Sequence, residues 1–107
     1  MNLVTGATGL LGSHIVEQLA VRSRPVRALV RPGADVAWLK TQPVELVEGD
    51  VTDPDSLARA CEGVECVYHA AARVGDWGPW RDFVRISIDG TANMLAAAIA
   101  TKAKRFI

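Results

Sequence analysis

The sequence has few of the residues that characterise metal-binding and disulfide-rich proteins. Its 107 residues include only two cysteines, Cys61 and Cys66, and two histidines. A metal site would need further ligands close by, and His69 is the only other candidate near them in the sequence. Because Cys66 belongs to an apolar stretch and Cys61 to the end of a predicted helix, we expect two buried, reduced thiols and no metal site.

The chain also lacks an excess of charge of either sign. Twelve Lys and Arg side chains balance twelve Asp and Glu side chains, so the formal net charge is zero. Proteins that bind nucleic acid usually carry a basic excess, and we therefore expect no nucleic-acid partner. No apolar run approaches the roughly 20 residues that span a bilayer, and no basic segment with an apolar signal core precedes the first predicted strand. We expect no membrane partner and a cytoplasmic location.

The composition that is present is that of a globular protein, with half of the residues hydrophobic and 22% charged. The length is typical of one domain, so residues 1–107 are predicted to form a single one. Apolar strand-like runs alternate with helical patterns, which favours a parallel sheet with helices on both faces. The predicted strands are 2–5, 26–30, 44–47, 64–69 and the start of a fifth at 105–107, and the predicted helices are 11–22, 34–40, one that ends near 61, and 81–101. Right-handed crossovers then predict a Rossmann-like, doubly wound α/β sheet of order 3-2-1-4, with a truncated fifth strand beside the fourth.

A glycine-rich stretch, Thr5-Gly6-Ala7-Thr8-Gly9-Leu10-Leu11-Gly12, joins the first predicted strand to the first predicted helix. Gly6 permits a tight turn, Gly9 lets a diphosphate approach the backbone, and Gly12 lets the helix pack closely on the strand. The free N–H groups at the start of that helix favour a phosphate. Glycines also mark ordinary turns, but the order of strand, turn and helix favours dinucleotide binding. The candidate cofactor-binding residues here are Gly6, Thr8, Gly9, Leu10, Leu11 and Gly12.

Three more motifs follow in the sequence: Gly49-Asp50-Val51-Thr52-Asp53, Val67-Tyr68-His69-Ala70-Ala71-Ala72, and Asp89-Gly90-Thr91-x-Asn93. Together with the glycine-rich stretch they resemble the extended short-chain dehydrogenase/reductase family, which contains nicotinamide-dependent epimerases, dehydratases and reductases. The Arg-Pro-Gly after the second strand and the Trp-Gly-Pro-Trp loop are most similar to the dihydroflavonol reductase-like and sugar epimerase-like branches.

The resemblance implies further cofactor contacts at the ends of the third and fourth predicted strands. In similar proteins the carboxylate at Asp50 accepts a hydrogen bond from the adenine amino group, and the next residue, Val51, offers backbone contacts. The small residues Ala70, Ala71 and Ala72 would let the backbone approach the ribose and diphosphate. The alternatives are a capping or loop aspartate and simple packing of small side chains. His69 has no acidic neighbour in the sequence to orient it, so we interpret it as a packed histidine at a strand end.

Two positions depart from the family pattern. Val30 falls where members that prefer NAD carry an acidic residue that holds the ribose hydroxyls. The next residue is Arg31, whose guanidinium is suited to pair with the 2′-phosphate of NADP. We therefore expect NADP as cofactor, with NAD as the alternative if Arg31 is a solvated loop residue. The second departure is Ser87, where the family commonly has asparagine, and serine can still form one hydrogen bond.

The acid/base pair of the resembled family, a tyrosine with a lysine four residues later, is missing from these 107 residues. The only tyrosine is Tyr68, and Ala72 stands four residues after it. No catalytic residue is therefore predicted, and the chain is interpreted as the dinucleotide-binding half of an oxidoreductase, epimerase or dehydratase that is inactive by itself. The alternative is a non-enzymatic, cofactor-binding regulatory module. Because the sequence stops within a predicted strand, we also expect self-association through an incomplete sheet edge.

Overall fold

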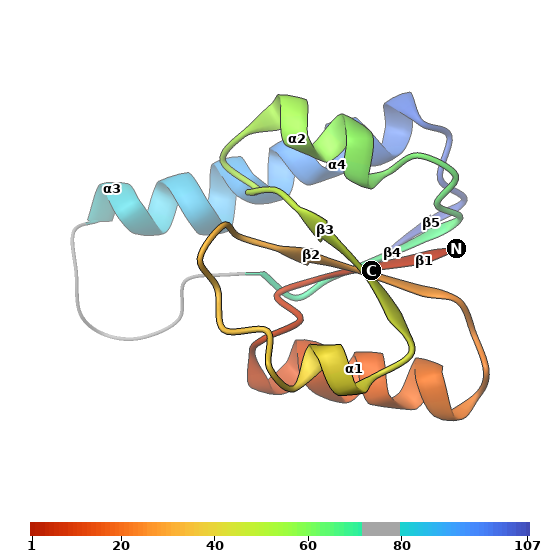
Figure 1. Cartoon of the computed structure of the whole chain (residues 1–107). Coiled ribbons are helices and arrows are strands. Elements are labelled where there is room, and N and C mark those ends of the chain that lie inside the picture. Colours follow the sequence, from red (N-terminus) through yellow and green to blue (C-terminus); the bar gives the residue numbers. More distant parts are fainter. Residues whose placement is uncertain (72–79) are drawn as a thin grey trace.

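The computed structural model describes residues 1–71 and 80–107 and contains a five-stranded parallel sheet between two layers of helices (Figure 1). The strands lie in the order β3-β2-β1-β4-β5. Their bounds are β1 Asn2–Thr5, β2 Val26–Val30, β3 Val44–Glu48, β4 Cys66–His69 and β5 Arg105–Phe106. The predicted Rossmann-like fold and strand order are thereby confirmed, including the short fifth strand beside the fourth.

The helices cover the two faces of the sheet unequally. Helix α1 (Leu10–Val21) lies on one face, and α2 (Pro54–Ala60) and α4 (Gly90–Ala100) lie together on the other (Figure 1). From β1 the chain moves outward through β2 to β3 and then returns to place β4 on the opposite side of β1. The strand order therefore reverses between β1 and β4, and ligands of such sheets bind in the crevice beyond the carboxyl ends of the strands at that point.

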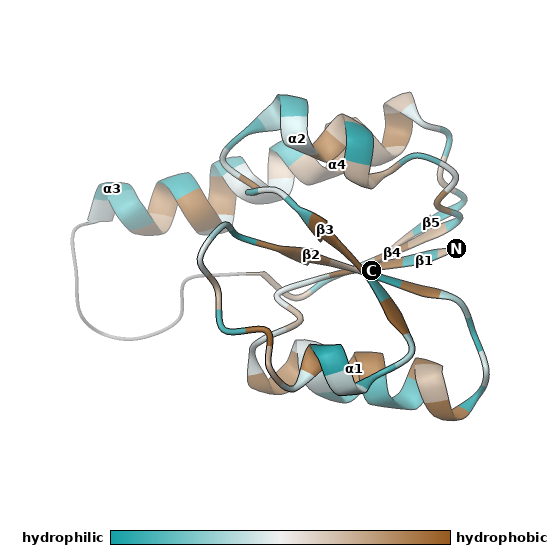
Figure 2. Cartoon of the chain, in the orientation of Figure 1, coloured by the Kyte–Doolittle hydropathy of each residue, from teal (hydrophilic) through white to brown (hydrophobic). Residues whose placement is uncertain are grey.

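Alternation along the strands divides the apolar core between the two faces. Leu3 of β1 packs with α2 and α4, while the next residue, Val4, packs with α1. The same change of face separates Leu29 from Val30 on β2, as expected for side chains that point alternately to opposite sides of a sheet. Figure 2 shows the apolar strands β2 and β3 running between the helical layers.

Both cysteines lie within this core, as the sequence predicted. Cys61, directly after α2, is fully buried, and Cys66 at the start of β4 is buried too. Neither forms a disulfide. Burial raises the pKa of the Cys61 thiol above its ordinary value, although a hydrogen bond with Thr101 acts in the opposite direction. A protonated thiol at that place behaves as a small apolar side chain.

The predicted helix over residues 34–40 is wrong. Only a short 3-10 turn, Leu39–Thr41, is present in this connection. The Asp35 carboxylate accepts a hydrogen bond of 3.1 Å from the Ala37 amide, and such a local turn competes with a helix for the backbone donors. One turn is sufficient here, because it carries Leu39 to a fully buried position beneath α1.

The long helix predicted for residues 81–101 is present but is not uniform. It begins as α3 (Trp80–Phe83), continues as a π-helical segment (Val84–Asp89) and ends as α4. The Gly90 amide donates to the Arg85 carbonyl, five residues earlier, so one residue more than usual is accommodated in that turn. The sequence contained no signal for this insertion.

By length and mean hydropathy alone, the helical run Trp80–Ala100 could also cross a membrane, which was not expected from the sequence. Core helices of soluble proteins pass the same test. In this fold Gly90, Met94 and Ala98 are buried on the side of the run that faces the other elements. Met94 and Ala98 belong to the apolar cluster shared with α2 and the sheet.

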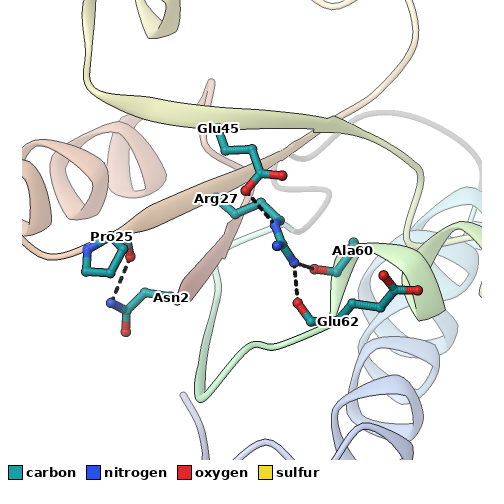
Figure 3. A network of polar contacts seen from close by, with 6 residues as sticks. All are labelled: Asn2, Pro25, Arg27, Glu45, Ala60 and Glu62. Carbon is teal, nitrogen blue, oxygen red and sulfur yellow. Dashed lines mark hydrogen bonds and ion pairs between the residues drawn. The ribbon is translucent and has the colours of Figure 1, made fainter.

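A half-buried arginine, Arg27, connects β2 to the end of α2 (Figure 3). Arg27 Nη1 donates to the carbonyls of Ala60 and Glu62, at 2.8 and 2.7 Å, and Arg27 Nε lies 3.2 Å from Glu45 Oε2. The last carbonyls of a helix have no partner within it, and the guanidinium supplies donors to two carbonyls there. This contact holds the end of α2, and the residues that follow it, against the sheet.

Candidate functional site

Glycine occupies the three positions of the turn after β1 for different structural reasons. Gly6 has a positive φ of 66°, and a Cβ there would lie 2.7 Å from the Ala70 carbonyl carbon. A Cβ on Gly12 would lie 1.9 Å from the Gly6 carbonyl oxygen. Gly9 is extended (φ −84°, ψ 175°), and its Cβ would meet one atom, the Gly6 oxygen, at 3.3 Å. Backbone conformation and packing therefore require glycine at Gly6 and Gly12, whereas Gly9 leaves open the space outside the turn.

The start of α1 offers uncompensated backbone donors beside that space. Gly9 is the N-cap residue and has no side chain to accept a hydrogen bond, and the first turn contains no acidic residue. The first N–H groups of a helix have no partner within it and lie at the positive end of its dipole. Thr8 is exposed, and so are Leu10 and Leu11, which are 82% and 66% exposed. The arrangement can hold a phosphate by its backbone.

The end of β4 lies directly against this turn. The Ala71 amide donates to Thr5 Oγ1 at 3.1 Å, and the Ala70 amide donates to the Thr5 carbonyl at 3.3 Å. Because a Cβ on Gly6 would contact both alanines, the two segments meet backbone to backbone at the reversal of the strand order. The third predicted alanine, Ala72, lies outside the described residues.

Asp50, at the end of β3, is oriented by its own loop. Its Oδ1 accepts hydrogen bonds from the amide and the hydroxyl of Thr52, both at 2.9 Å. Its amide donates to the Ser56 hydroxyl at 3.0 Å. Oδ1 therefore has the role of a loop aspartate, which was the alternative interpretation of this residue. Oδ2 makes no hydrogen bond with the residues that the structure describes. That oxygen remains for an amino group of a ligand.

Helix α2 has Asp53 as its N-cap residue, but the Asp53 side chain forms no capping hydrogen bond. The buried Ser56 hydroxyl instead donates to the Asp53 carbonyl at 2.8 Å. The same hydroxyl accepts a hydrogen bond from the Asp50 amide. Ser56 therefore binds both the start of α2 and Asp50, the residue predicted to contact adenine.

Val51 is held by α4 rather than left free. Its side chain is buried, and a Cβ on Gly90 would lie 2.7 Å from Val51 Cγ2. Its carbonyl accepts a hydrogen bond of 2.9 Å from Asn93 Nδ2. Of the backbone contacts predicted for this residue, the carbonyl is thus already used within the chain. Thr52 and Asn93 line a depression beside this contact, together with residues of the long helix.

Arg31 and Val30 lie at the end of β2. Val30 is buried in the cluster under α1, and Arg31 is exposed. The Arg31 side chain makes no hydrogen bond or ion pair with residues 1–71 or 80–107, in contrast to Arg27 on the same strand. Its guanidinium is therefore free to pair with an anionic ligand. Thr8 lines a second depression, formed between α1 and the loop that carries Asp35.

His69 is packed at the end of β4, and it has hydroxyl partners rather than an acid. Its Nδ1 lies 2.8 Å from Thr5 Oγ1, and its Nε2 lies 2.9 Å from Thr91 Oγ1. The ring also packs near Phe106, at 5.7 Å between centroids. Burial lowers the pKa of His69 below its ordinary value, which favours the neutral imidazole.

Tyr68 does not have the environment of a catalytic phenol. Burial, followed by a hydrogen bond with Cys66, raises the pKa of Tyr68. A tyrosine that exchanges a proton near neutral pH needs the opposite shift, which a nearby lysine would produce. The residue four positions after Tyr68 is Ala72, so the sequence supplies no lysine at that spacing.

Sequence reasoning missed four residues that hold the site together: Thr5, Ser56, Thr91 and Asn93. Thr91 and Asn93 stand in the last quoted motif, but without a structure no partner could be assigned to them. The structure assigns Thr91 to His69 and Asn93 to the Val51 carbonyl. The motif thus connects α4 to the ends of both β4 and β3.

Comparisons with known proteins agree with this geometry. A sequence model described as the NAD dependent epimerase/dehydratase family matches residues 2–107. Sterol demethylase protein B of Methylococcus capsulatus is 39% identical over 98% of this chain and 32% of its own length. A dihydroflavonol 4-reductase-like protein of Synechocystis sp. is 36% identical over 89% of this chain and 28% of its own length.

Among solved structures, a short-chain dehydrogenase/reductase superfamily protein of Agrobacterium tumefaciens with bound NAD superposes with a TM-score of 0.82. It is 32% identical, and the match covers 99% of this chain and 31% of that protein. The chain thus spans about a third of the length of the relatives it matches. With the glycine turn, the strand order and a match over residues 2–107, the chain belongs to the NAD-dependent epimerase/dehydratase family.

Proposed function

We propose that this chain binds a nicotinamide dinucleotide across the carboxyl ends of β1 and β4. The observation that carries the proposal is the uncapped start of α1, whose N-cap Gly9 has no side chain to fill the space beside it. The diphosphate would lie on the N–H groups of that first turn, with Ala70 and Ala71 approaching from the other side. The NAD named with the Agrobacterium structure supports this class of ligand.

Asp50 and Val51 would bind the adenine end of the same cofactor. The Asp50 Oδ2 atom is the acceptor for the adenine amino group, because the loop already uses Oδ1. Val51 contributes through its backbone, while Asn93 and Gly90 keep its carbonyl and side chain in place. Titration calorimetry with NAD and with NADP tests the proposal, and a folded protein that binds neither would refute it.

We also propose that NADP is the preferred cofactor. Val30 is apolar and buried, so it cannot accept hydrogen bonds from the ribose hydroxyls. Arg31 is exposed beside it, and its guanidinium has no partner among the residues that the structure describes. The extra phosphate of NADP carries charge that a guanidinium can meet with two parallel hydrogen bonds.

Arg31→Ala is expected to weaken NADP binding and to leave NAD binding nearly unchanged. Loss of a charge-assisted hydrogen bond costs roughly 1.5–3 kcal/mol where the pair is well desolvated. Calorimetric titration of both cofactors measures the difference. Arg24→Ala is the matched control, because Arg24 is also exposed but precedes β2, at the opposite end of that strand. Equal losses for both cofactors would contradict the NADP preference.

For the whole protein we propose a reductase, epimerase or dehydratase, of which these residues supply the cofactor-binding part. The name of the Synechocystis relative supports a reductase-like activity for a protein about three times as long. A regulatory module that binds cofactor without turnover is the second candidate. The cytoplasmic location stays a prediction.

The chain by itself is expected to show no hydride transfer and no epimerisation. Its one tyrosine has a raised pKa and no lysine four residues later, so these 107 residues lack the acid/base pair of the family. The measurement is absorbance of the reduced nicotinamide during incubation with a panel of ketones, alcohols and nucleotide sugars. Turnover that depends on cofactor and survives Tyr68→Phe would show that another residue acts as acid or base.

We expect the isolated chain to self-associate. The long helix exposes a row of apolar side chains, of which Ile88 and Ile99 are 52% and 68% exposed, and the edge strand β5 pairs through only two residues. Exposed apolar surface beside an open strand edge favours pairing with another chain. Light scattering over a dilution series measures the effect, and Ile99→Lys is expected to shift the protein toward monomer. A protein that is monomeric at every concentration would contradict this.

A further inference from the structure

A series of hydrogen bonds connects the residue after β4, the end of β1 and helix α4 at the candidate cofactor site. It runs from the Ala71 amide to Thr5, from Thr5 to His69, and from His69 to Thr91 on α4. Thr5 is fully buried, and His69 and Thr91 are half-buried. The proposed function uses Ala71 but assigns no role to the three side chains behind it.

The direction of each hydrogen bond follows from the hydroxyl protons. The Thr91 hydroxyl donates to the Ser87 carbonyl at 2.7 Å, so its oxygen must accept from His69 Nε2–H. Thr5 Oγ1 accepts from the Ala71 amide, which leaves its own proton to be donated to His69 Nδ1. Only the neutral imidazole protonated at Nε2 satisfies both ends. Burial, which lowers the pKa of His69, favours the same neutral form.

The consequence concerns the orientation of one amide. Ala71 follows β4, and a Cβ on Gly6 would lie 2.7 Å from its amide nitrogen, so its backbone lies directly against the glycine turn. The Thr5 hydroxyl could rotate away from the amide if its proton had no acceptor, but the imidazole supplies that acceptor. Thr91 in turn prevents the imidazole from rotating, because it holds Nε2 from α4.

We propose that His69 is a positioning residue for the dinucleotide: through Thr5 it fixes the Ala71 amide, and through Thr91 it ties this side of the crevice to α4. The proposal rests on the dinucleotide-binding function argued above. It differs from a role in packing alone, because it assigns separate tasks to the two ring nitrogens. Nδ1 accepts the Thr5 proton and so orients the hydroxyl that binds the Ala71 amide. Nε2 donates to Thr91 and so fixes the orientation of the ring.

Two conservative substitutions separate these tasks. Asparagine can place an acceptor oxygen near the former Nδ1, whereas glutamine reaches the former Nε2 position and leaves Thr5 without its acceptor. Thr5→Val removes the hydroxyl itself at nearly equal volume. Thr91→Val removes only the hydrogen bond between Thr91 and His69 Nε2. It leaves the hydrogen bonds that join His69, Thr5 and the Ala71 amide intact.

The first measurement does not depend on cofactor. Nitrogen-15 NMR of the 107-residue protein should show His69 as the Nε2–H tautomer, with the exposed His14 as the internal reference. Hydrogen exchange of the Ala71 amide should be at least about tenfold faster in Thr5→Val and His69→Gln and nearly unchanged in His69→Asn, as for loss of one buried hydrogen bond. Equal exchange rates in His69→Gln and His69→Asn, or an Nδ1–H tautomer, would overturn the proposal.

The second measurement is the affinity for NADP by titration calorimetry. We expect His69→Gln and Thr5→Val to weaken binding by about tenfold or more, His69→Asn to retain it within about twofold, and Thr91→Val to fall between. Melting temperatures serve as the comparison, because a role in packing alone would weaken binding in proportion to lost stability. If the unaltered protein binds neither NADP nor NAD, the proposed function fails, and Ala71 exchange still decides whether His69 positions that amide.

Discussion

Gly12→Ala should destabilise the protein by about 3 kcal/mol or more, the upper range for overpacking of a tightly packed position. A Cβ at this position would lie 1.9 Å from the Gly6 carbonyl oxygen and 2.9 Å from the Ala7 Cα. These are backbone atoms of the turn between β1 and α1, so they cannot move aside as a flexible side chain would. Either α1 must shift away from the sheet or the turn must change its conformation.

The measurement for Gly12→Ala is the free energy of unfolding in urea, followed by tryptophan fluorescence. Domains of this size are stable by roughly 5–15 kcal/mol, so the loss should be visible as a large fall in the midpoint. Gly9→Ala is the matched control, because the backbone at Gly9 is extended and its nearest contact would be 3.3 Å. Similar midpoints for the two variants would mean that α1 does not pack on the turn as described.

Gly9→Val should abolish detectable dinucleotide binding while the protein stays folded. The φ and ψ of Gly9 are accessible to valine, and only the Gly6 oxygen lies within 4 Å of its ideal Cβ. The branched side chain would therefore occupy the space outside the turn, where the diphosphate needs to approach the N–H groups of α1. Titration calorimetry against NADP and NAD checks the loss.

A graded series makes the result for Gly9→Val specific. Gly9→Ala should weaken binding less than valine does, because it fills less of the same space. Gln18→Val places the same branched side chain on an exposed position of α1, away from the turn, and should leave the affinity unchanged. Unchanged affinity in a folded Gly9→Val protein would exclude the glycine turn as the phosphate site.

Much of the fold was predictable from sequence, because its signals are local. Val26–Val30 was predicted with the bounds that the structure has, since a proline before it and Arg-Pro-Gly after it interrupt the apolar run. The strand order followed from right-handed crossovers and a phosphate-binding first turn. The helix over 34–40 failed because the Asp35 carboxylate bonds its own loop, a competition that apolar spacing does not reveal.

The candidate site divides in the same way. Local pattern indicated the glycine turn, because it joins a predicted strand to a predicted helix. The cofactor contacts of Asp50 and of the alanines after β4 came from the resemblance to a family. Local pattern gave no partner for Thr5 or Thr91. Both are hydrogen-bonded to His69, which lies 64 positions after Thr5 and 22 positions before Thr91.

The sequence by itself determined where each strand lies to within a residue or two, and which stretch starts a helix without a cap. Backbone geometry and turn chemistry act between near neighbours. Only the tertiary structure decided what holds those ends in place. The π-helical segment precedes Gly90 and Thr91, which meet Val51 in the loop after β3 and His69 at the end of β4. Contacts of that kind depend on how packed layers fit together, and packing is a property of the assembled chain.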